Sequence, residues 1–481
     1  MAPATVSKIR PDDSRTKFQA IGLHNAAKIG LLDNLDADTR EAVNVVSHVL
    51  PFRTNKYVTE NLIDWSRVPD DPIFRLVFPQ RQMLEDRDFA EVRDLLKRDV
   101  PKAGLAETVN RIRFGLNPHP AGQLTHNVPL LDGKPVEGLQ HKYRETVLFF
   151  PSAGQTCHAY CTYCFRWAQF VGMEDLKFEA KDPDGLVQYL KAHPEVTDVL
   201  FTGGDPMVMR TRVLRRFIEP LLSPDLEHVK NIRIGTKAVS YWPQRFVSDE
   251  DADDLMRLFE EVVASGRQLA IMGHYSHPVE LAPEIAREAI KRIRSTGAQI
   301  RMQAPLIRHV NDNAGSWAEL WRTGVNLGLV PYYMFVERDT GARNYFEVPL
   351  IRAYDIFREA YGSVSGLART VRGPSMSTFF GKVRIHGILR MHELMDPATL
   401  RMLHDNFSYS AYDPTTPLML CDFIQARDPA WVKRPFVAEF DEDASWLSDL
   451  RPAFGRNRFY FQENAADEDY SQLSLTELLL E

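Results

Sequence analysis

Between residues 146 and 336, short apolar and β-branched runs alternate with longer segments of helical periodicity. Six of these runs predict strands: 146–152, 198–206, 231–237, 268–276, 299–307 and 329–336. Strands that alternate with helices predict an α/β fold with a parallel sheet, either doubly wound or curled into a partial barrel. In both arrangements the chemistry lies at the carboxyl ends of the strands.

Two of the segments between strands have clear helical signals. In residues 280–297, four apolar side chains share one face of the expected helix: Ile285, Ala289, Ile290 and Ile293. In residues 248–266, Ser248 and Asp251 have the spacing of a capping box, and Gly266 ends the pattern. We expect both helices to pack on the sheet.

The alternation divides the chain into four parts. Residues 1–44 are polar and predict a helical or partly ordered extension. Residues 45–140 mix helical patterns with Pro-rich connections and predict a collar or lid, while 141–390 form the barrel core. Residues 391–481 lose the alternation and form a C-terminal extension, and the leucines of residues 463–481 predict either a docking helix or a frayed tail.

Composition narrows the class of protein. The 481 residues are 44% hydrophobic, with a net charge of −7 and four cysteines. A chain of this length can bury a large core without disulfides, and its low cysteine content is typical of a reducing cytosol. It contains neither a signal-peptide pattern nor an apolar run long enough to span a membrane. We therefore expect a cytoplasmic protein with no membrane or nucleic-acid partner.

Three of the four cysteines lie within the stretch CHAYCTYCFRW, residues 157–167, as Cys157, Cys161 and Cys164. They directly follow the first predicted strand, where a barrel keeps its active site. The spacing CxxxCxxC places three thiolates on one loop. Such a loop can hold a four-iron cluster that has one iron open to a ligand.

Two other interpretations of the cysteines compete with the cluster. A disulfide does not fit the expected compartment and leaves one thiol unpaired. Zinc needs four ligands, and His158 or His141 could complete a Cys3His set. Since no second ligand pair is nearby and Cys421 is about 260 residues away, the spacing favours iron–sulfur over zinc.

Several stretches resemble, in order, the lysine 2,3-aminomutase family of the radical S-adenosylmethionine (SAM) superfamily. They are residues 141–167, 196–207, 229–246, 274–281, 301–312 and 329–335. The resemblance covers roughly residues 45–390. It implies a partial (β/α)6 barrel that binds a 4Fe–4S cluster through Cys157, Cys161 and Cys164.

The resemblance also implies a SAM site. The stretch TGGDP matches the motif whose backbone meets the amino group of SAM, at Gly203, Gly204 and Asp205. A plain turn after a strand is the alternative, although a second glycine allows a backbone to approach a ligand closely. By the same match, Gln303 contacts the nucleoside. His274 and His277 either face the cavity or are structural.

Members of this family also bind pyridoxal phosphate (PLP) through a Schiff-base lysine, and residues 370–385 place Lys382 at that position. The apolar context FFGKVRI favours a neutral, nucleophilic amine there. Near the phosphate, Lys142 is retained as a cation, while Thr146 stands where the family has a second Arg. The segment SMSTFF replaces a run of glycines, which puts PLP binding in doubt.

The resemblance assigns the substrate's α-carboxylate to Arg166. Lysine-specific members pair the substrate's distal ammonium with two aspartates, and these positions fall on Arg338 and Arg372 here. Inverting the sign of the pocket predicts an acidic substrate of the glutamate or aspartate type. The alternative is a one-residue slip in the match, since Asp339 adjoins Arg338.

Three functions are therefore compared. The leading one is a radical SAM 2,3-aminomutase for an acidic amino acid, which takes its electron from a flavodoxin or ferredoxin and forms a homo-oligomer. The second is a PLP-free radical SAM enzyme that modifies a small molecule or peptide. The third is a non-catalytic iron–sulfur or zinc protein, against which the GGD motif and Arg166 argue because a structural metal site needs neither.

Overall fold

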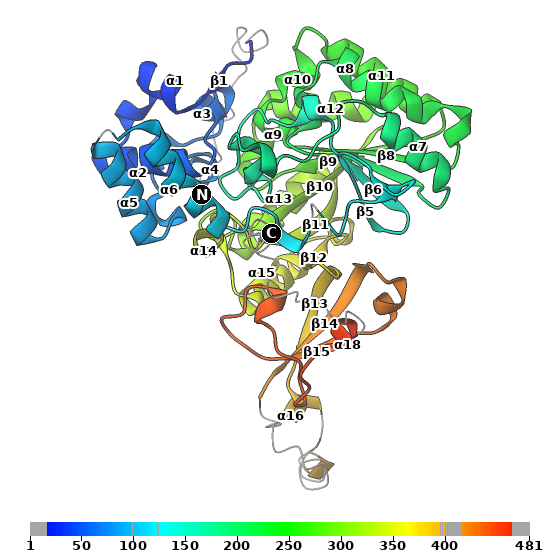
Figure 1. The fold of residues 1–481 in the computed structure, drawn as a ribbon. Coiled ribbons are helices and arrows are strands. Elements are labelled where there is room, and N and C mark those ends of the chain that lie inside the picture. Colours follow the sequence, from blue (N-terminus) through cyan, green and yellow to red (C-terminus); the bar gives the residue numbers. More distant parts are fainter. Residues whose placement is uncertain are drawn as a thin grey trace.

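The computed structural model describes residues 17–98, 100–122, 125–394, 396, 398–399 and 416–463. The predicted docking helix or frayed tail covers residues 463–481, of which 464–481 lie outside this description, as do residues 1–16. Figure 1 shows an N-terminal helical part beside the barrel and a C-terminal part extending below it.

Eleven strands of the described chain form one sheet in the order β15-β14-β13-β12-β11-β10-β9-β8-β7-β6-β5. The strands from β6 to β12 are parallel, while β5 at one end and β13 to β15 at the other are antiparallel. The parallel strands are β6 (Thr146–Phe149), β7 (Asp198–Phe201), β8 (Asn231–Thr236), β9 (Gln268–His274), β10 (Gln299–Leu306), β11 (Val330–Val336) and β12 (Arg372–Ser377). The antiparallel strands are β5 (Leu139–Tyr143), β13 (Gly381–Leu389), β14 (Leu418–Ala426) and β15 (Phe436–Glu439).

All six predicted strands are confirmed, as β6 to β11. Helices pack on the outer face of the sheet, and apolar side chains of both fill the largest core. The main ones are α7 (Asp184–Ala192), α8 (Thr211–Ile218), α11 (Ala252–Ala264), α12 (Glu284–Ser295), α13 (Ala314–Asn326) and α15 (Leu350–Gly362). Among the described residues, no helix has both the length and the apolar character needed to cross a membrane.

Helix α12 has the predicted buried face, but the capping box predicted for α11 is wrong. Asp251 occupies the N-cap, yet its side chain makes no cap hydrogen bond. Its carboxylate instead accepts a hydrogen bond from the Thr211 amide at 2.6 Å and pairs with Arg245 at 3.0 Å. Thr211 and Arg245, which lie outside the helix, therefore bind the carboxylate that the local pattern assigned to the helix cap.

The collar and the described part of the N-terminal extension share a second core, which packs against the cysteine loop. The helices of these two parts are α1 (Leu23–Lys28), α2 (Ala37–Val49), α3 (Lys56–Asn61), α4 (Pro72–Val77), α5 (Asp86–Lys97) and α6 (Lys102–Gly115). Tyr163 and Trp167 of the cysteine loop are buried within this core. The collar and the loop therefore pack as one unit.

The two ends of the sheet approach each other, which supports the predicted partial barrel. Lys142 on β5 donates a hydrogen bond through its Nζ to the Thr378 carbonyl, in the turn between β12 and β13. Arg427, which follows β14, donates to the His126 carbonyl at 3.2 Å. These contacts join the strands before and after the parallel set, so the sheet is curled.

Candidate active site

The three predicted cluster ligands lie on one loop after β6, at the carboxyl edge of the parallel strands. Cys157, Cys161 and Cys164 are free, half-buried thiols. Burial raises the pKa of each thiol, and the neighbouring thiols raise those of Cys157 and Cys164 further, to about 12 for Cys164. The three sulfurs are therefore close enough to repel as thiolates. A bound cationic centre would hold them ionised.

The histidines considered as zinc ligands have other surroundings. His141 Nδ1 lies 2.6 Å from the Tyr189 hydroxyl, and the His158 ring stacks on Trp242 with centres 6.3 Å apart. In the described part of the chain, no three or more His, Cys, Asp or Glu side chains are arranged as ligands of a metal ion. Each cysteine of a four-iron cluster binds a different iron atom, so the three loop thiols need not converge on one point.

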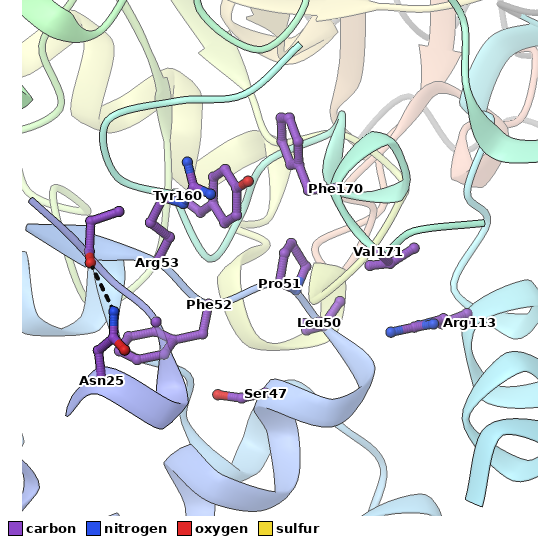
Figure 2. Close-up of a pocket in the computed structure, with 12 residues that line it drawn as sticks. Asn25, Ser47, Leu50, Pro51, Phe52, Arg53, Arg113, Tyr160, Phe170 and Val171 are labelled. Carbon is purple, nitrogen blue, oxygen red and sulfur yellow. Dashed lines mark hydrogen bonds between the residues drawn. The ribbon is translucent and has the colours of Figure 1, made fainter. Parts of the chain in front are cut away.

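The collar holds the backbone of the cysteine loop. Arg53 donates to the Thr156 hydroxyl at 2.7 Å and to the Cys157 carbonyl at 3.2 Å. Figure 2 shows Arg53 beside Tyr160 in a pocket of about 430 Å³, with Arg113 at the opposite end. This pocket lies at the seam between collar and loop, whereas the predicted SAM and substrate residues come from the barrel strands and their loops.

The GGD turn after β7 packs directly on the cysteine loop. Gly203 has a φ of 135°, and a Cβ on Gly204 would lie 2.5 Å from backbone atoms of Thr156. The Asp205 amide donates to the Thr156 carbonyl at 2.7 Å. The Asp205 carboxylate accepts hydrogen bonds from the Thr236 hydroxyl and from three backbone amides. Its side chain therefore fixes the turn, and the two glycines let the turn pack closely against Gln155 and Thr156 of the cysteine loop.

His274 and Gln303 are register partners on β9 and β10. The neighbours of Gln303 on its strand, Met302 and Ala304, belong to the outer core, so Gln303 lies on the inner face of the sheet. His274 Nε2 lies 3.0 Å from the hydroxyl of Tyr163, which stands between two of the loop cysteines. His274 on β9 therefore holds the cysteine loop in place through its contact with Tyr163.

His277 has a structural contact. Its Nδ1 accepts a hydrogen bond from the Val279 amide at 3.3 Å, so the ring caps the short helix η12 (Pro278–Leu281). Burial lowers the pKa of His277 to about 4, with a further contribution from Arg67. The imidazole is therefore neutral at pH 7, as an acceptor must be.

Arg166 is buried next to the cysteine loop. One guanidinium nitrogen, Nη2, lies 3.2 Å from Gln155 Oε1 and 3.3 Å from Gln169 Oε1, and the guanidinium carbon lies 4.4 Å from the centre of the Phe150 ring. Its Nε is buried and has no hydrogen-bond partner among the described residues. Burial lowers the pKa of Arg166 to about 10, so it remains charged and can bind an anion.

Lys382 reaches into the barrel from β13. Its amine lies 4.2 Å from the centre of the Tyr333 ring. Burial, then the charges of Arg233 and Arg372, lower its pKa to about 7. A large fraction of the amine is therefore neutral at pH 7, as Schiff-base formation requires, so the residues present fit PLP.

Lys142 and Thr146, the two residues expected near the PLP phosphate, have different neighbours: Lys142 lies among cations, and Thr146 lies beside a carboxylate. The pKa of the Lys142 amine is lowered well below its usual value, first by burial and then by Arg427, Arg338 and Lys382. Several cations therefore gather where the two ends of the sheet meet. Thr146, in contrast, lies 3.3 Å from the carboxylate of Asp198.

Arg338 and Arg372 lie at opposite ends of adjacent strands. Arg338 follows β11, donates to the Pro120 carbonyl at 3.4 Å and lies 5.2 Å from the centre of the Phe165 ring. Arg372 begins β12, is exposed and donates to the Tyr333 hydroxyl at 3.3 Å. Arg338 therefore lies on the side of the cysteine loop, and Arg372 on the side of Lys382.

Sequence reasoning missed three residues of the barrel interior and its rim: His119, Arg233 and Tyr333. Arg233 pairs with Asp198 at 2.7 Å and, like Tyr333, lies near Lys382. Polar residues at inward positions of a strand were an available signal for Arg233. His119 lies in a Pro-rich connection, where no local pattern indicates burial.

Comparisons with known proteins identify the family. No protein-family model matches the chain. It is 30% identical over 372 residues to a protein of Aquifex aeolicus named "Putative L-lysine 2,3-aminomutase", which covers 76% of this chain and 87% of the relative. The L-lysine 2,3-aminomutase of Escherichia coli is 30% identical over 248 residues, covering 50% of this chain and 68% of the relative.

Among solved structures, a radical SAM methyltransferase from Sphaerobacter thermophilus has a TM-score of 0.34 and 15% identity, and covers 67% of this chain and 92% of its own. That similarity is too low to support an argument. The Aquifex match spans most of both sequences and confirms the family predicted from the motifs. The chain belongs to the lysine 2,3-aminomutase family.

Proposed function

We propose that this chain is a radical SAM 2,3-aminomutase that moves the amino group of an acidic amino acid from C2 to C3. The proposal rests on its family membership and on the arrangement of the loops at the carboxyl edge of the barrel. It includes a 4Fe–4S cluster on Cys157, Cys161 and Cys164, SAM at the GGD turn, and PLP on Lys382.

The observation that carries the proposal is the joining of the cysteine loop to the GGD turn. The Asp205 amide donates to the carbonyls of both Gly154 and Thr156, at 2.9 and 2.7 Å. The cysteines that would hold the cluster and the backbone of Gly203 and Gly204, where SAM would bind, therefore lie on loops that are joined to each other. When bound, the cluster held by the three cysteines would supply the electron for the cleavage of SAM, and PLP on Lys382 would carry the migrating nitrogen.

In this proposal, the chain's own residues position the reactants. Gln303 on the inner face of β10 contacts the nucleoside, and His274 orients the cysteine loop through Tyr163. Arg166 binds the substrate's α-carboxylate, since its buried Nε has no partner among the described residues. The Lys382 amine holds the PLP, and Lys142 contributes positive charge on the phosphate side.

The charge around Arg338 supports an acidic substrate. Arg338 is buried on the side of the cysteine loop, and burial raises the pKa of the adjacent Glu337 carboxyl well above its usual value. Asp339 and Glu337 are the carboxylates that interact with Arg338, and its buried Nε has no hydrogen-bond partner among the described residues. A distal carboxylate could form charge-assisted hydrogen bonds with Arg338, whereas a distal ammonium would be repelled in a site that excludes water.

The test offers glutamate, aspartate, lysine, arginine and alanine separately to the protein reconstituted with iron, sulfide, PLP, SAM and a reductant. We expect deoxyadenosine and a β-amino acid to form with glutamate or aspartate. A matched variant, Arg338→Gln, should lose the preference for acids. Turnover of lysine in preference to both acids would overturn the proposed substrate class.

A second candidate is a PLP-free radical SAM enzyme that acts on a small molecule or peptide. The contact of Thr146 with Asp198 favours it, because Thr146 is uncharged and stands where the family has a second Arg. Absorption spectra separate the two candidates. A protein that gains the cluster absorption near about 400 nm but takes up no borohydride-reducible PLP would support the second candidate.

A further inference from the structure

The collar loop that contains His119 is fixed to the loop after β11. The Asn117 side-chain amide donates to the Asp339 carbonyl at 2.7 Å, and the Gly341 amide donates to the Leu116 carbonyl at 2.8 Å. Thr340 links the two segments to the cysteine loop, because its hydroxyl accepts a hydrogen bond from Trp167 Nε1 at 2.9 Å. His119 is therefore held in place by three parts of the chain.

The His119 ring is buried, with 9% of the residue exposed, and neither ring nitrogen has a hydrogen-bond partner among the described residues. It lines a small cavity together with Arg166. The cavity volume of about 10 Å³ has room for about one water-sized group, so only the end of a ligand can enter. Buried polar groups without partners are costly, so a water or the polar end of a ligand is expected to pair with the ring.

Arg166, which lines the same cavity, also has a buried donor without a partner among the described residues. Its hydrogen bonds to the side chains of Gln155 and Gln169 and to the Phe178 carbonyl all come from Nη2. Its Nε is buried and has no partner in the described chain. An anionic oxygen in the cavity would thus find a guanidinium donor and an imidazole donor together.

We propose that His119 is a further substrate-positioning residue, whose neutral imidazole donates a hydrogen bond to the carboxylate that Arg166 binds. This rests on the proposed function, which assigns the substrate's α-carboxylate to Arg166. Burial and the charge of Arg166 lower the pKa of His119 to about 4. A neutral ring adds a donor without repelling the guanidinium, and the donor fixes the rotation of the carboxylate.

The experiment measures dissociation constants by calorimetry for two ligand pairs, glutamate with its α-carboxamide and lysine with its α-carboxamide. The wild-type protein should prefer each acid to its amide. The His119→Phe variant fills the space but lacks the donor, and should bind the acid about 10-fold more weakly with little change for the amide. His119→Asn retains a donor and should keep most of the preference. The control His48→Phe, on α2 of the collar, should behave as wild type.

One further readout separates this role from a structural one. In protein with ¹⁵N-labelled histidine, an acid but not its amide should shift one imidazole signal, and that signal should be absent from His119→Asn. This measurement decides the question if His119→Phe does not fold.

The outcomes distinguish this inference from the proposed function. An unchanged acid-to-amide ratio in folded His119→Phe, alongside normal β-amino acid formation by the wild type, would overturn the inference alone. A reduced ratio with no β-amino acid formed by the wild type would support the inference and overturn the proposed function. If no amino acid binds the wild type, both are overturned.

Discussion

The amine of Lys382 lies 4.2 Å from the centre of the Tyr333 ring, although the two residues come from strands on either side of β12. No carboxylate forms an ion pair with Lys382 among the described contacts, and the nearest charges that shift its pKa are mainly cationic. An aromatic face stabilises the ammonium less than a carboxylate would. The lysine is therefore suited to react as a neutral amine.

Replacing Lys382 by Ala should abolish the borohydride-reducible PLP absorption while leaving the iron content unchanged, because the amine and the cysteines are separate ligands. Absorption spectra and iron analysis after reconstitution measure both properties. The control is Lys191→Ala, which removes an exposed lysine paired with Asp225. Retention of reducible PLP by Lys382→Ala would exclude Lys382 as the Schiff-base residue.

Each of Cys157→Ala, Cys161→Ala and Cys164→Ala should lose cluster iron and SAM cleavage, because three thiolates are the minimum set. Cys421→Ala should keep both, since Cys421 is buried in β14 within the C-terminal core. Its cost should be limited to stability, at about 1–2 kcal/mol for a small cavity. Iron analysis and thermal unfolding test this. Loss of iron from Cys421→Ala alone would contradict the open-iron assignment.

Gly204→Ala should reduce SAM cleavage by about 100-fold, because the new Cβ would displace the cysteine loop and small displacements at a reacting centre have effects of this size. The clash involves backbone atoms of Thr156 at 2.5 Å, which cannot move as a flexible side chain does. Gly104→Ala on α6 is the matched control, since nothing lies within 4 Å of its added Cβ. Wild-type deoxyadenosine formation by Gly204→Ala would show that the close approach is not required.

Much of the barrel could be predicted because its signals are local. The apolar runs of β6 to β11 and the spacing of the cysteines are readable without knowledge of the fold. The capping box at Asp251 failed for the opposite reason, since Thr211 and Arg245 compete for that carboxylate only in the folded chain. Short sequence patterns predict elements well until a tertiary partner intervenes.

The candidate site was predicted less completely than the barrel, because contacts between residues far apart in the sequence decide which side chains meet there. Residues 370–385 form all of β12, a turn and the start of β13. Arg372 therefore begins one strand, whereas Arg338 follows the end of its neighbour β11. The His119 loop is fixed by the hydrogen bond from Asn117 to Asp339, residues 222 positions apart. No local pattern in the sequence indicates such a contact.

The buried neutral His277 should make the protein less stable in acid. The unfolded chain binds a proton at this ring below its ordinary pKa of about 6.5, whereas the folded chain binds it only below about 4. The unfolded state therefore carries more protons between these values, so the free energy of unfolding falls as pH drops through this window and is fully restored above it. Protonation would also remove the acceptor for the Val279 amide.

The expected loss attributable to His277 is about 2–3 kcal/mol between pH 7 and pH 4, allowing for partial exposure of the ring. Urea unfolding of the cluster-free protein at a series of pH values measures the slope. His277→Asn, which retains an acceptor for the cap but does not titrate, should flatten the slope by about one proton. Equal slopes for wild type and His277→Asn would show that this histidine does not titrate differently in the folded and unfolded states.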